Sequence, residues 1–307
     1  MPRVEAGTAL YGVVGWPLRN TLSPRLHNSA FTALGLPAVY VPLRVAPERA
    51  GTLIEALETL GVRGANVTSP LKDAAFAQCR RASPDAAAAR SVNTLTRGRG
   101  GWTGASTDGP GFLDFLATAG IDSGGAAKNA VVLGSGGAAR SLAVSLLGSG
   151  KGGRVTLITR DPRRAGRRFG ALPRPARGGA LQIVRRSGRA AADAVRFARL
   201  VINATPLGSA GTGARLPCPP AWIGAGAVAV DLVYGRETPW RRALRTRGTT
   251  AFSGLGMLIH QAARSFELWT GRNPLEWMLW TGGWADELAR STGARAGARK
   301  GLHPLSR

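Results

Sequence analysis

The sequence predicts an α/β protein with two domains and mostly parallel sheets. Short apolar segments of strand length alternate with segments of helical periodicity along most of the chain. A chain of 307 residues is long enough to form two hydrophobic cores. A second α/β unit begins at Ala130, where an apolar segment leads into a glycine-rich turn and then into a helix.

The first half of the chain contains several predicted elements. We expect strands at residues 9–15, 39–45, 64–68 and 91–96, helices at 24–34, 47–60 and 74–81, and a turn at 98–101. Pro24 suits the first turn of its helix, and Ser23 before it is the expected N-cap.

The second half begins with a helix at 109–121 that joins the two units. Further strands are expected from residue 130 and at 154–159, 181–184, 200–203 and 228–233, with loops at 171–180 and 208–220. An amphipathic helix at 256–271 ends at Gly271 and is expected to return to the first domain.

The turn after the strand at residue 130 fits the pattern G-x-G-x-x-G/A through Gly134, Gly136 and Ala139. A glycine at the first position permits the tight turn, and one at the second lets a pyrophosphate approach the backbone. The free N–H groups at the start of the following helix then face the phosphates. The pattern predicts a Rossmann-type domain that binds a dinucleotide.

Thr159 and Arg160 end the second strand of this unit, at the position that meets the adenosine ribose. An arginine there favours the 2′-phosphate of NADP, because its planar guanidinium matches phosphate oxygens. Asp161 follows and would repel a phosphate if it pointed inward. Its alternative role is the N-cap of a helix that begins at Pro162. We predict NADP (NADPH) as the cofactor.

Polar residues lie at successive strand ends of the first domain: Thr21, Ser23, Asn66, Thr68, Lys72, Asn93, Thr94 and Asp108. Ligands of open α/β sheets bind outside the carboxyl ends of strands, so these side chains could converge on one small polyhydroxylated molecule. Lys72 and Asp108 form a candidate proton-transfer pair. The alternatives are a surface lysine at a helix start and an aspartate in a turn before Gly109.

Nine motif segments follow one another along the chain: Gly15–Asn28, Gly64–Lys72, Ser91–Leu95, Gly104–Gly111, Gly134–Arg140, Thr159–Asp161, Asn203–Gly208, Asp231–Tyr234 and Gly254–Gln261. In these motifs and their order the chain resembles the shikimate dehydrogenase family. Four positions depart from the family pattern. They are Asn20 for His, Thr21 for Ser, Arg90 for Gly and Ser106 for Asn.

The resemblance implies NADPH-dependent reduction of 3-dehydroshikimate to shikimate in the biosynthesis of aromatic amino acids. It implies Lys72 and Asp108 as the catalytic pair, with Asp108 also among the substrate-binding residues Thr21, Ser23, Asn66, Thr68, Asn93, Tyr234 and Gln261. The implied cofactor-binding residues are Gly134, Ser135, Gly136, Gly137, Ala138, Arg140, Thr159, Arg160, Arg164, Asn203, Ala204, Thr205, Gly254 and Met257. No metal is expected.

Together these observations predict three regions. Residues 1–112 form the substrate-binding and catalytic domain, which the helical segment 252–290 completes; residues 113–251 form the NADP-binding domain, and 291–307 a basic tail. The methyl group of Thr21 leaves open a quinate/shikimate dehydrogenase that uses NAD or both cofactors. A non-catalytic ligand sensor or a nucleic-acid-binding protein on the same fold is the alternative from another class.

The net charge of +24 would suit nucleic-acid binding. However, only four of the 41 basic residues are lysines and the excess lacks interleaved aromatic residues, which favours a compositional origin. We therefore expect a small-molecule substrate, no nucleic acid and no membrane, in a monomer or homodimer. Two cysteines without metal-ligand spacing and no signal-peptide pattern predict a cytoplasmic protein.

Overall fold

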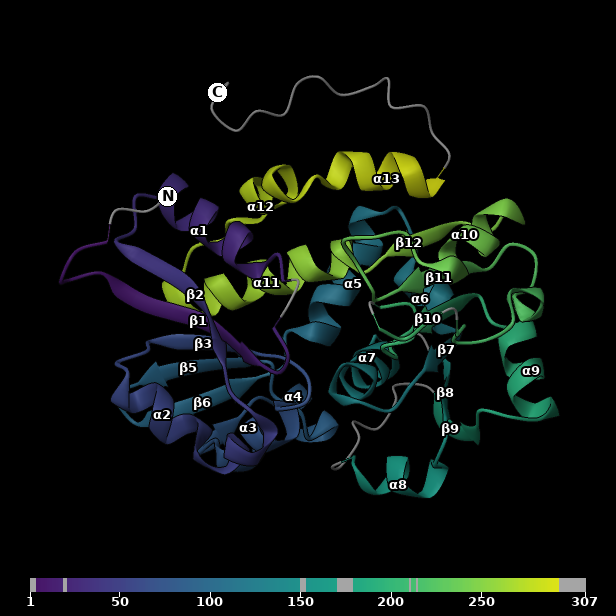
Figure 1. The fold of residues 1–307 in the computed structure, drawn as a ribbon. Helices are drawn as coiled ribbons and strands as arrows, with labels where there is room; N and C mark the ends of the chain where they lie inside the picture. The colour runs from purple at the N-terminus through teal and green to yellow at the C-terminus, as the bar shows by residue number, and fades with distance from the viewer. Residues whose placement is uncertain are drawn as a thin grey trace.

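The structure is a computed structural model that describes residues 4–18, 21–149, 153–169, 179–209, 211–213 and 215–292. Two six-stranded sheets lie side by side, the first built from residues before 106 and the second from residues after 128 (Figure 1). We call them sheet A, of order β2-β1-β3-β5-β6-β4, and sheet B, of order β12-β11-β10-β7-β8-β9. This confirms the predicted α/β fold class.

Sheet A contains β1 (Ala9–Gly15), β2 (Ala38–Arg44), β3 (Gly64–Val67), β4 (Arg81–Ala82), β5 (Thr94–Gly98) and β6 (Gly101–Ala105). β1 pairs in parallel with β2 and β3, and β4 with β6. β5 runs antiparallel to both β3 and β6. β5 and β6 form a hairpin around the predicted turn. β5 begins at Thr94 and not at Ser91, so Asn93 lies just before the strand.

The helices of this half are α1 (Ser23–Ala33), η1 (Pro47–Thr52), α2 (Leu53–Thr59), α3 (Lys72–Gln78) and α4 (Pro84–Ala89). The single helix predicted at 47–60 is wrong, since a 3₁₀ segment containing Gly51 precedes the α-helix. The N-cap prediction for Ser23 is also wrong. Leu22 is the N-cap, and Ser23 is a buried residue of α1 whose hydroxyl is left for other contacts.

Sheet B is parallel throughout. Its strands are β7 (Asn129–Leu133), β8 (Arg154–Thr159), β9 (Ala180–Arg185), β10 (Leu200–Asn203), β11 (Val228–Asp231) and β12 (Ala251–Ser253). Its helices are α7 (Gly137–Gly148), α8 (Pro162–Arg167), α9 (Arg189–Arg196), η2 (Pro220–Trp222) and α10 (Pro239–Thr246). All five predicted strands of this unit are present; residues 171–178 of the first predicted loop lie outside the described residues.

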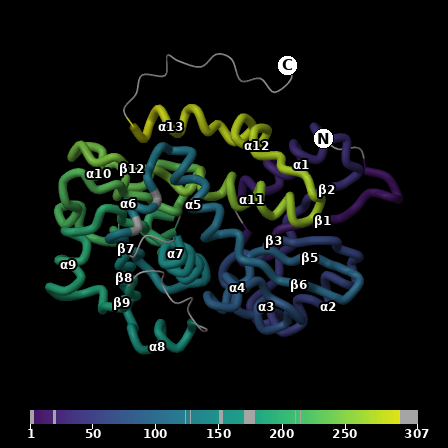
Figure 2. Tube along the Cα trace, turned by 180° about the vertical axis from the view of Figure 1, so that it is seen from behind, coloured from purple at the N-terminus to yellow at the C-terminus, as the bar shows by residue number. Residues whose placement is uncertain are grey.

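Helices between the sheets join the two halves. α5 (Asp108–Thr118) packs against both α7 and α11 (Leu255–Thr270), and α6 (Ser123–Ala127) leads into β7. α12 (Leu275–Gly282) contacts α1 of the first half, and α13 (Trp284–Thr292) contacts β12 of the second. These two helices therefore cross over both halves (Figures 1 and 2). The return of the 256–271 helix is thus confirmed. Residues 293–307 of the predicted tail lie outside the described residues.

One hydrophobic core spans this junction. Phe115 of α5 makes edge-on contacts with Phe112, with Phe252 of β12 and with Trp284 of α13, at centroid distances of 5.6, 5.6 and 5.8 Å. A Cβ atom on Gly256 would overlap the Phe115 ring, so α5 and α11 approach as closely as they do only because residue 256 is glycine. This aromatic contact therefore fixes how α5 packs on β12, α11 and α13.

Two buried histidines make stability depend on pH. His27 stacks on Tyr40 at 4.3 Å, and burial lowers its pKa to about 3. Burial also lowers the pKa of His260 to about 4. Unfolded histidine titrates near pH 6.5, so this stabilisation is complete above about pH 6.5 and is lost as the pH falls below it. At pH 5 each histidine should lower the free energy of unfolding by about 2 kcal/mol.

Urea unfolding at pH 7.5 and pH 5.0 tests this dependence. His27→Phe keeps an aromatic ring on Tyr40 and removes the titrating group, so it should lose about 2 kcal/mol less than the wild type between the two pH values. An equal loss in both proteins would contradict the role given to His27.

Candidate active site

A cavity of about 270 Å³ lies between the two halves of the molecule. Every residue predicted to bind substrate or to act in catalysis lines it: Thr21, Ser23, Asn66, Thr68, Lys72, Asn93, Asp108, Tyr234 and Gln261. Ala138, Gly254 and Met257, predicted to contact the cofactor, line it as well. The rest of its wall is apolar: Val13, Pro17, Leu18, Val67, Leu232 and Leu258.

The convergence follows from the strand ends. β1 and β3 run parallel, so the segments after them, which hold Thr21 and Thr68, meet at one edge of sheet A. Asn66 lies within β3. Lys72 and Asp108 begin α3 and α5, which puts both side chains at helix N-termini directed to the same edge. Gln261 comes from the returning helix α11.

Lys72 and Asp108 form an ion pair through Nζ and Oδ2, although 36 positions separate them in the chain. Their side chains are 14% and 6% exposed, so the pair is largely withdrawn from water but open to the cavity. Asn93 Nδ2 donates to Asp108 Oδ1 over 2.9 Å, which leaves Oδ2 for Lys72. This arrangement holds an ammonium group in one place at the cavity wall.

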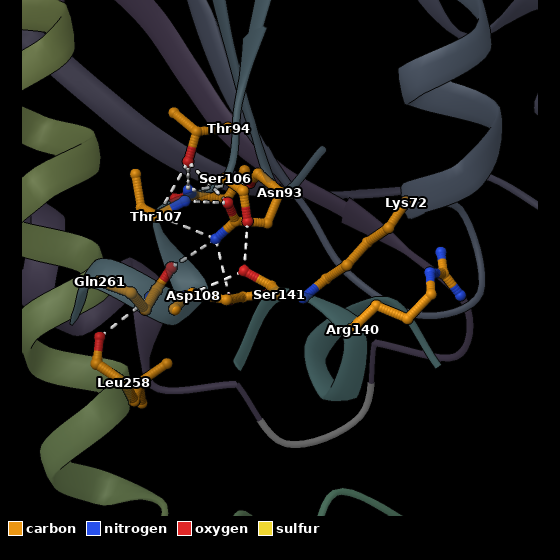
Figure 3. A network of polar contacts seen from close by, with 12 residues as sticks. Lys72, Asn93, Thr94, Ser106, Thr107, Asp108, Arg140, Ser141, Leu258 and Gln261 are labelled. Atoms are coloured by element: carbon orange, nitrogen blue, oxygen red, sulfur yellow. Dashed lines mark hydrogen bonds and ion pairs between the residues drawn. The ribbon is translucent and has the colours of Figure 1, made fainter. Parts of the chain in front are cut away.

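Asn93 orients the surrounding polar groups (Figure 3). Its Nδ2 also donates to Thr107 Oγ1 over 2.9 Å and to Gln261 Oε1 over 3.1 Å, and its Oδ1 accepts from the Thr107 N–H over 2.7 Å. Asn66 Nδ2 donates to Ser265 Oγ over 2.8 Å, and Asn66 Oδ1 accepts from the Tyr40 hydroxyl over 2.7 Å. These contacts, some to other cavity residues and some to residues behind the wall, fix the orientation of both amide groups.

Hydroxyl groups gather at another part of the wall. The side chain of Thr21 and the backbone of Leu22 hydrogen-bond Tyr234; burial raises the pKa of the Tyr234 phenol and these bonds oppose that shift. Burial likewise raises the pKa of Tyr40, and a hydrogen bond with the Ser23 side chain opposes it. Thr21, Ser23 and Tyr234 therefore offer neutral hydroxyls to an anionic or hydroxylated ligand.

The glycine-rich turn lies beside this cavity and fits a phosphate. Gly134 has φ of +123°, and a Cβ there would lie 3.0 Å from the Ala204 carbonyl oxygen, so only glycine suits the position. A Cβ on Gly136 would meet nothing within 4 Å. Gly136 is the N-cap of α7 and has no side chain to cap it, which leaves the helix N-terminus open to an anion.

The ribose end of the predicted cofactor site lies at the end of β8. The hydroxyl groups of Thr159 and Ser135 form a hydrogen bond of 3.0 Å. Arg160 and Arg164 are exposed. Asp161 caps α8, since its carboxylate accepts from the Arg164 N–H over 2.9 Å. The N-cap interpretation of Asp161 is thus confirmed, and its carboxylate is bound to its own helix.

Two other predicted cofactor residues have their polar groups engaged within the protein. Asn203 is fully buried and bonds to Asp231, to the Leu207 carbonyl and to Thr205, which shapes the loop after β10. Arg140 is fully buried, and its guanidinium contacts Asp73 and backbone carbonyls. Asn20 lies outside the described residues.

Sequence reasoning missed three residues of the polar network: Tyr40, Thr107 and Ser265. Ser265 could have been found, because it lies one helical turn after Gln261 on the same face. Thr94 and Thr107 adjoin Asn93 and Asp108, but nothing local indicates that their hydroxyls bond to each other and to Ser265.

The described ranges contain no group of three or more His, Cys, Asp or Glu side chains able to hold a metal ion. None of their helices combines the length and hydropathy needed to span a bilayer. Burial raises the pKa of Cys79 to about 11 and that of Cys218 to about 12, so both thiols are protonated at neutral pH.

Comparison with known proteins identifies the family. Residues 13–95 match the model of the shikimate dehydrogenase substrate binding domain, and residues 254–276 match the shikimate 5′-dehydrogenase C-terminal domain. A shikimate dehydrogenase (NADP(+)) from Moorella thermoacetica is 41% identical over 274 residues, which cover 89% of this chain and 91% of that protein. The chain belongs to the shikimate dehydrogenase family.

Other members of the shikimate dehydrogenase family agree with this. The enzyme of that name from Acidiphilium cryptum is 42% identical over 272 residues, covering 87% of this chain and 92% of that protein. Among solved structures, shikimate 5-dehydrogenase from Thermus thermophilus, in complex with NADP(H) and shikimate, superposes with a TM-score of 0.76 at 32% identity. That match covers 90% of this chain and 99% of the Thermus chain.

Proposed function

We propose that this protein is an NADP-dependent shikimate dehydrogenase. It reduces 3-dehydroshikimate to shikimate with NADPH and catalyses the reverse oxidation with NADP. The observation that carries the proposal is the Lys72–Asp108 ion pair, which faces a cavity lined with hydroxyl and amide groups next to the glycine-rich turn. The likeness to relatives named shikimate dehydrogenase (NADP(+)) over most of the chain supports it.

In this proposal the cavity wall binds the substrate at two ends. Thr21, Ser23 and Tyr234 accommodate the carboxylate through their hydroxyls. The amide and hydroxyl groups of Asn66, Thr68, Asn93 and Gln261, with the Asp108 carboxylate, bind the ring hydroxyls. A polar site whose groups are already oriented should reject analogues that lack those hydroxyls, because its buried groups would then be left unpaired.

Lys72 is the proposed proton donor and acceptor. In the direction of reduction, its ammonium group donates a proton to the oxygen of the ring carbonyl as the carbonyl carbon gains a hydride, which gives the alcohol. Its positive charge also stabilises the developing alkoxide. Asp108, held by Asn93, orients the ammonium group. In the reverse direction Lys72 accepts the proton.

The cofactor supplies the hydride when bound, and the glycine-rich turn is its proposed site. The backbone of residues Gly134, Ser135, Gly136, Gly137 and Ala138 would hold the pyrophosphate at the α7 N-terminus. Ala204, Thr205, Gly254 and Met257 would flank the rest, with Asn203 shaping the loop that carries Ala204 and Thr205. We infer a domain division near residues 112 and 252, with the active site between the domains.

A spectrophotometric assay at about 340 nm tests the function through NADPH formation from shikimate and NADP. Quinate and NAD, tried separately, are the matched alternatives because Thr21 carries an additional methyl group at the carboxylate end. We expect the largest kcat/KM with shikimate and NADP. Turnover of quinate but not shikimate, or no turnover of either, would contradict the proposal.

Arg160→Ala tests the cofactor preference. A charge-assisted contact to the 2′-phosphate contributes about 1.5–3 kcal/mol, so the KM for NADP should rise about 10- to 100-fold while the KM for NAD changes little. Arg154→Ala is the matched control, because Arg154 is exposed at the opposite end of the same strand. An equal rise in both KM values would contradict the role of Arg160.

A further inference from the structure

Arg140 and Ser141 belong to α7, the helix that begins at the glycine-rich turn. Both are buried, and both lie close to the elements that carry Lys72 and Asp108 (Figure 3). Substrate binding and hydride transfer as proposed above use neither side chain for chemistry. Their contacts nevertheless cross from one half of the molecule to the other.

Arg140 links the glycine-rich turn to the helix of Lys72. Its Nη2 donates to Asp73 Oδ1 over 2.6 Å, and Asp73 follows Lys72 directly in α3. Its Nε donates to the Ala89 carbonyl over 2.7 Å and its Nη2 to that of Arg90 over 3.2 Å, at the end of α4. Its Nη1 donates to the Ser135 carbonyl over 3.1 Å. One planar guanidinium therefore joins three segments at fixed angles.

Ser141 links the same helix to the segment of Asp108. Its hydroxyl bonds to that of Ser106 at 2.5 Å and accepts from the Gly109 N–H over 3.0 Å. Ser106 and Gly109 lie on either side of Asp108 in the chain, so the start of α5 is held from both sides. Ser106 is one of the departures from the family pattern, and its short side chain brings the two hydroxyls together.

Gly137 brings α7 directly against the catalytic lysine. A Cβ atom at this position would lie 3.0 Å from Lys72 Cδ and would overlap Ser91 Oγ. The aliphatic part of Lys72 thus packs on the first residue of the helix. Lys72, Asp73 and the Asp108 segment all contact the first two turns of α7.

We propose that α7 sets the geometry of the Lys72–Asp108 pair, with Arg140 as positioning residue for Lys72 and Ser141 as positioning residue for Asp108. The inference rests on the proposed function, in which the N-terminus of this helix binds the cofactor phosphates. For Arg140, this positioning role replaces the cofactor binding that the family resemblance implies. The helix that binds the cofactor phosphates then also fixes the positions of Lys72 and Asp108 relative to the cofactor. This arrangement couples the two halves of the molecule during turnover.

Steady-state kinetics of Arg140→Gln, Asp73→Asn and Ser141→Ala test this role. Asp73→Asn and Ser141→Ala keep the inference testable if the loss of a buried guanidinium prevents folding. We expect kcat to fall about 10-fold or more in each, because a small misplacement of reacting groups is costly, while the KM for NADP changes less than about three-fold. The kcat of the double variant Arg140→Gln, Asp73→Asn should be no lower than that of the slower single variant, because both changes break the same contact between Arg140 and Asp73.

Two control variants match these changes. Arg168→Gln removes another arginine that pairs with Asp73 but is partly exposed, and Ser145→Ala deletes a hydroxyl one turn further along α7. Both should retain kcat within about two-fold. Wild-type kcat in Asp73→Asn and Ser141→Ala, or an Arg140→Gln variant with raised KM for NADP and unchanged kcat, would overturn the inference.

A second readout does not depend on the substrate. The chain has four lysines, so ¹³Cε-labelled lysine gives four signals, and Lys72→Met identifies that of Lys72. Ser141→Ala should move the Lys72 signal and Ser145→Ala should not; an unmoved signal in Ser141→Ala would overturn the inference. An inactive wild type whose Lys72 signal responds in this way would contradict the proposed function alone.

Discussion

Replacing Lys72 with Met should lower kcat for shikimate oxidation by about 10²–10⁴-fold, the contribution that a positioned proton-transfer group makes. Methionine keeps an unbranched apolar side chain that can pack on Gly137, so the loss should come from the missing ammonium group and not from a rearranged wall. The KM for shikimate should change much less, because the hydroxyl and amide groups of the cavity remain. Initial rates at about 340 nm, with circular dichroism of both proteins, measure this.

Lys72→Arg should not restore the rate. A guanidinium keeps the positive charge beside Asp108 but stays protonated throughout the accessible pH range, so it cannot exchange a proton with the substrate. Lys128→Met, which replaces an exposed lysine at the end of α6, is the control and should retain the wild-type kcat. Near-wild-type turnover in Lys72→Met would remove the basis of the proposed mechanism.

Replacing Phe115 with Ala should lower the free energy of unfolding by about 3–5 kcal/mol, through lost transfer energy and the cavity that remains. The effect should lie at the upper end for a single ring, because Phe115 contacts Phe112 of its own helix, Phe252 of β12 and Trp284 of α13. Urea unfolding followed by tryptophan fluorescence measures the change.

Phe197→Ala is the matched control for this experiment. Phe197 ends α9 and is 69% exposed, so its replacement should change the free energy of unfolding by less than about 0.5 kcal/mol. A loss below about 1 kcal/mol in Phe115→Ala would mean that this aromatic contact does not stabilise the packing of α5 on β12 and α13.

Local patterns predicted much of the fold. Five of the six strands of sheet B agree with the sequence prediction within one or two residues, because they are short apolar segments between polar turns; β12 (Ala251–Ser253) is not predicted. The division of 47–60 into two helices, the late start of β5 and the antiparallel course of β5 depended on how the β5–β6 hairpin and the neighbouring chain pack. Helices α12 and α13 had not been distinguished, since their faces are explained only by contacts with α1 and β12.

The candidate site divides in the same way. Thr21, Asn66, Lys72 and Asp108 could be singled out as polar residues near strand ends, and family motifs supplied Tyr234 and Gln261. Arg140 shows where such reasoning fails. Its position after the glycine-rich turn suggested a cofactor contact, whereas its side chain donates to Asp73 and to carbonyls of α4.

The sequence by itself determined most of the alternation of strands with helices, the glycine-rich turn and the residue types available for chemistry. These features depend on side-chain periodicity and backbone freedom over a few neighbouring residues. Only the tertiary structure decided that Lys72 meets Asp108, that α11 brings Gln261 to Asn93, and that α7 contacts Lys72 and two residues that flank Asp108. Such contacts join residues far apart in the chain, and they form because closing the core over α5, α7 and α11 leaves their buried polar groups no other partners.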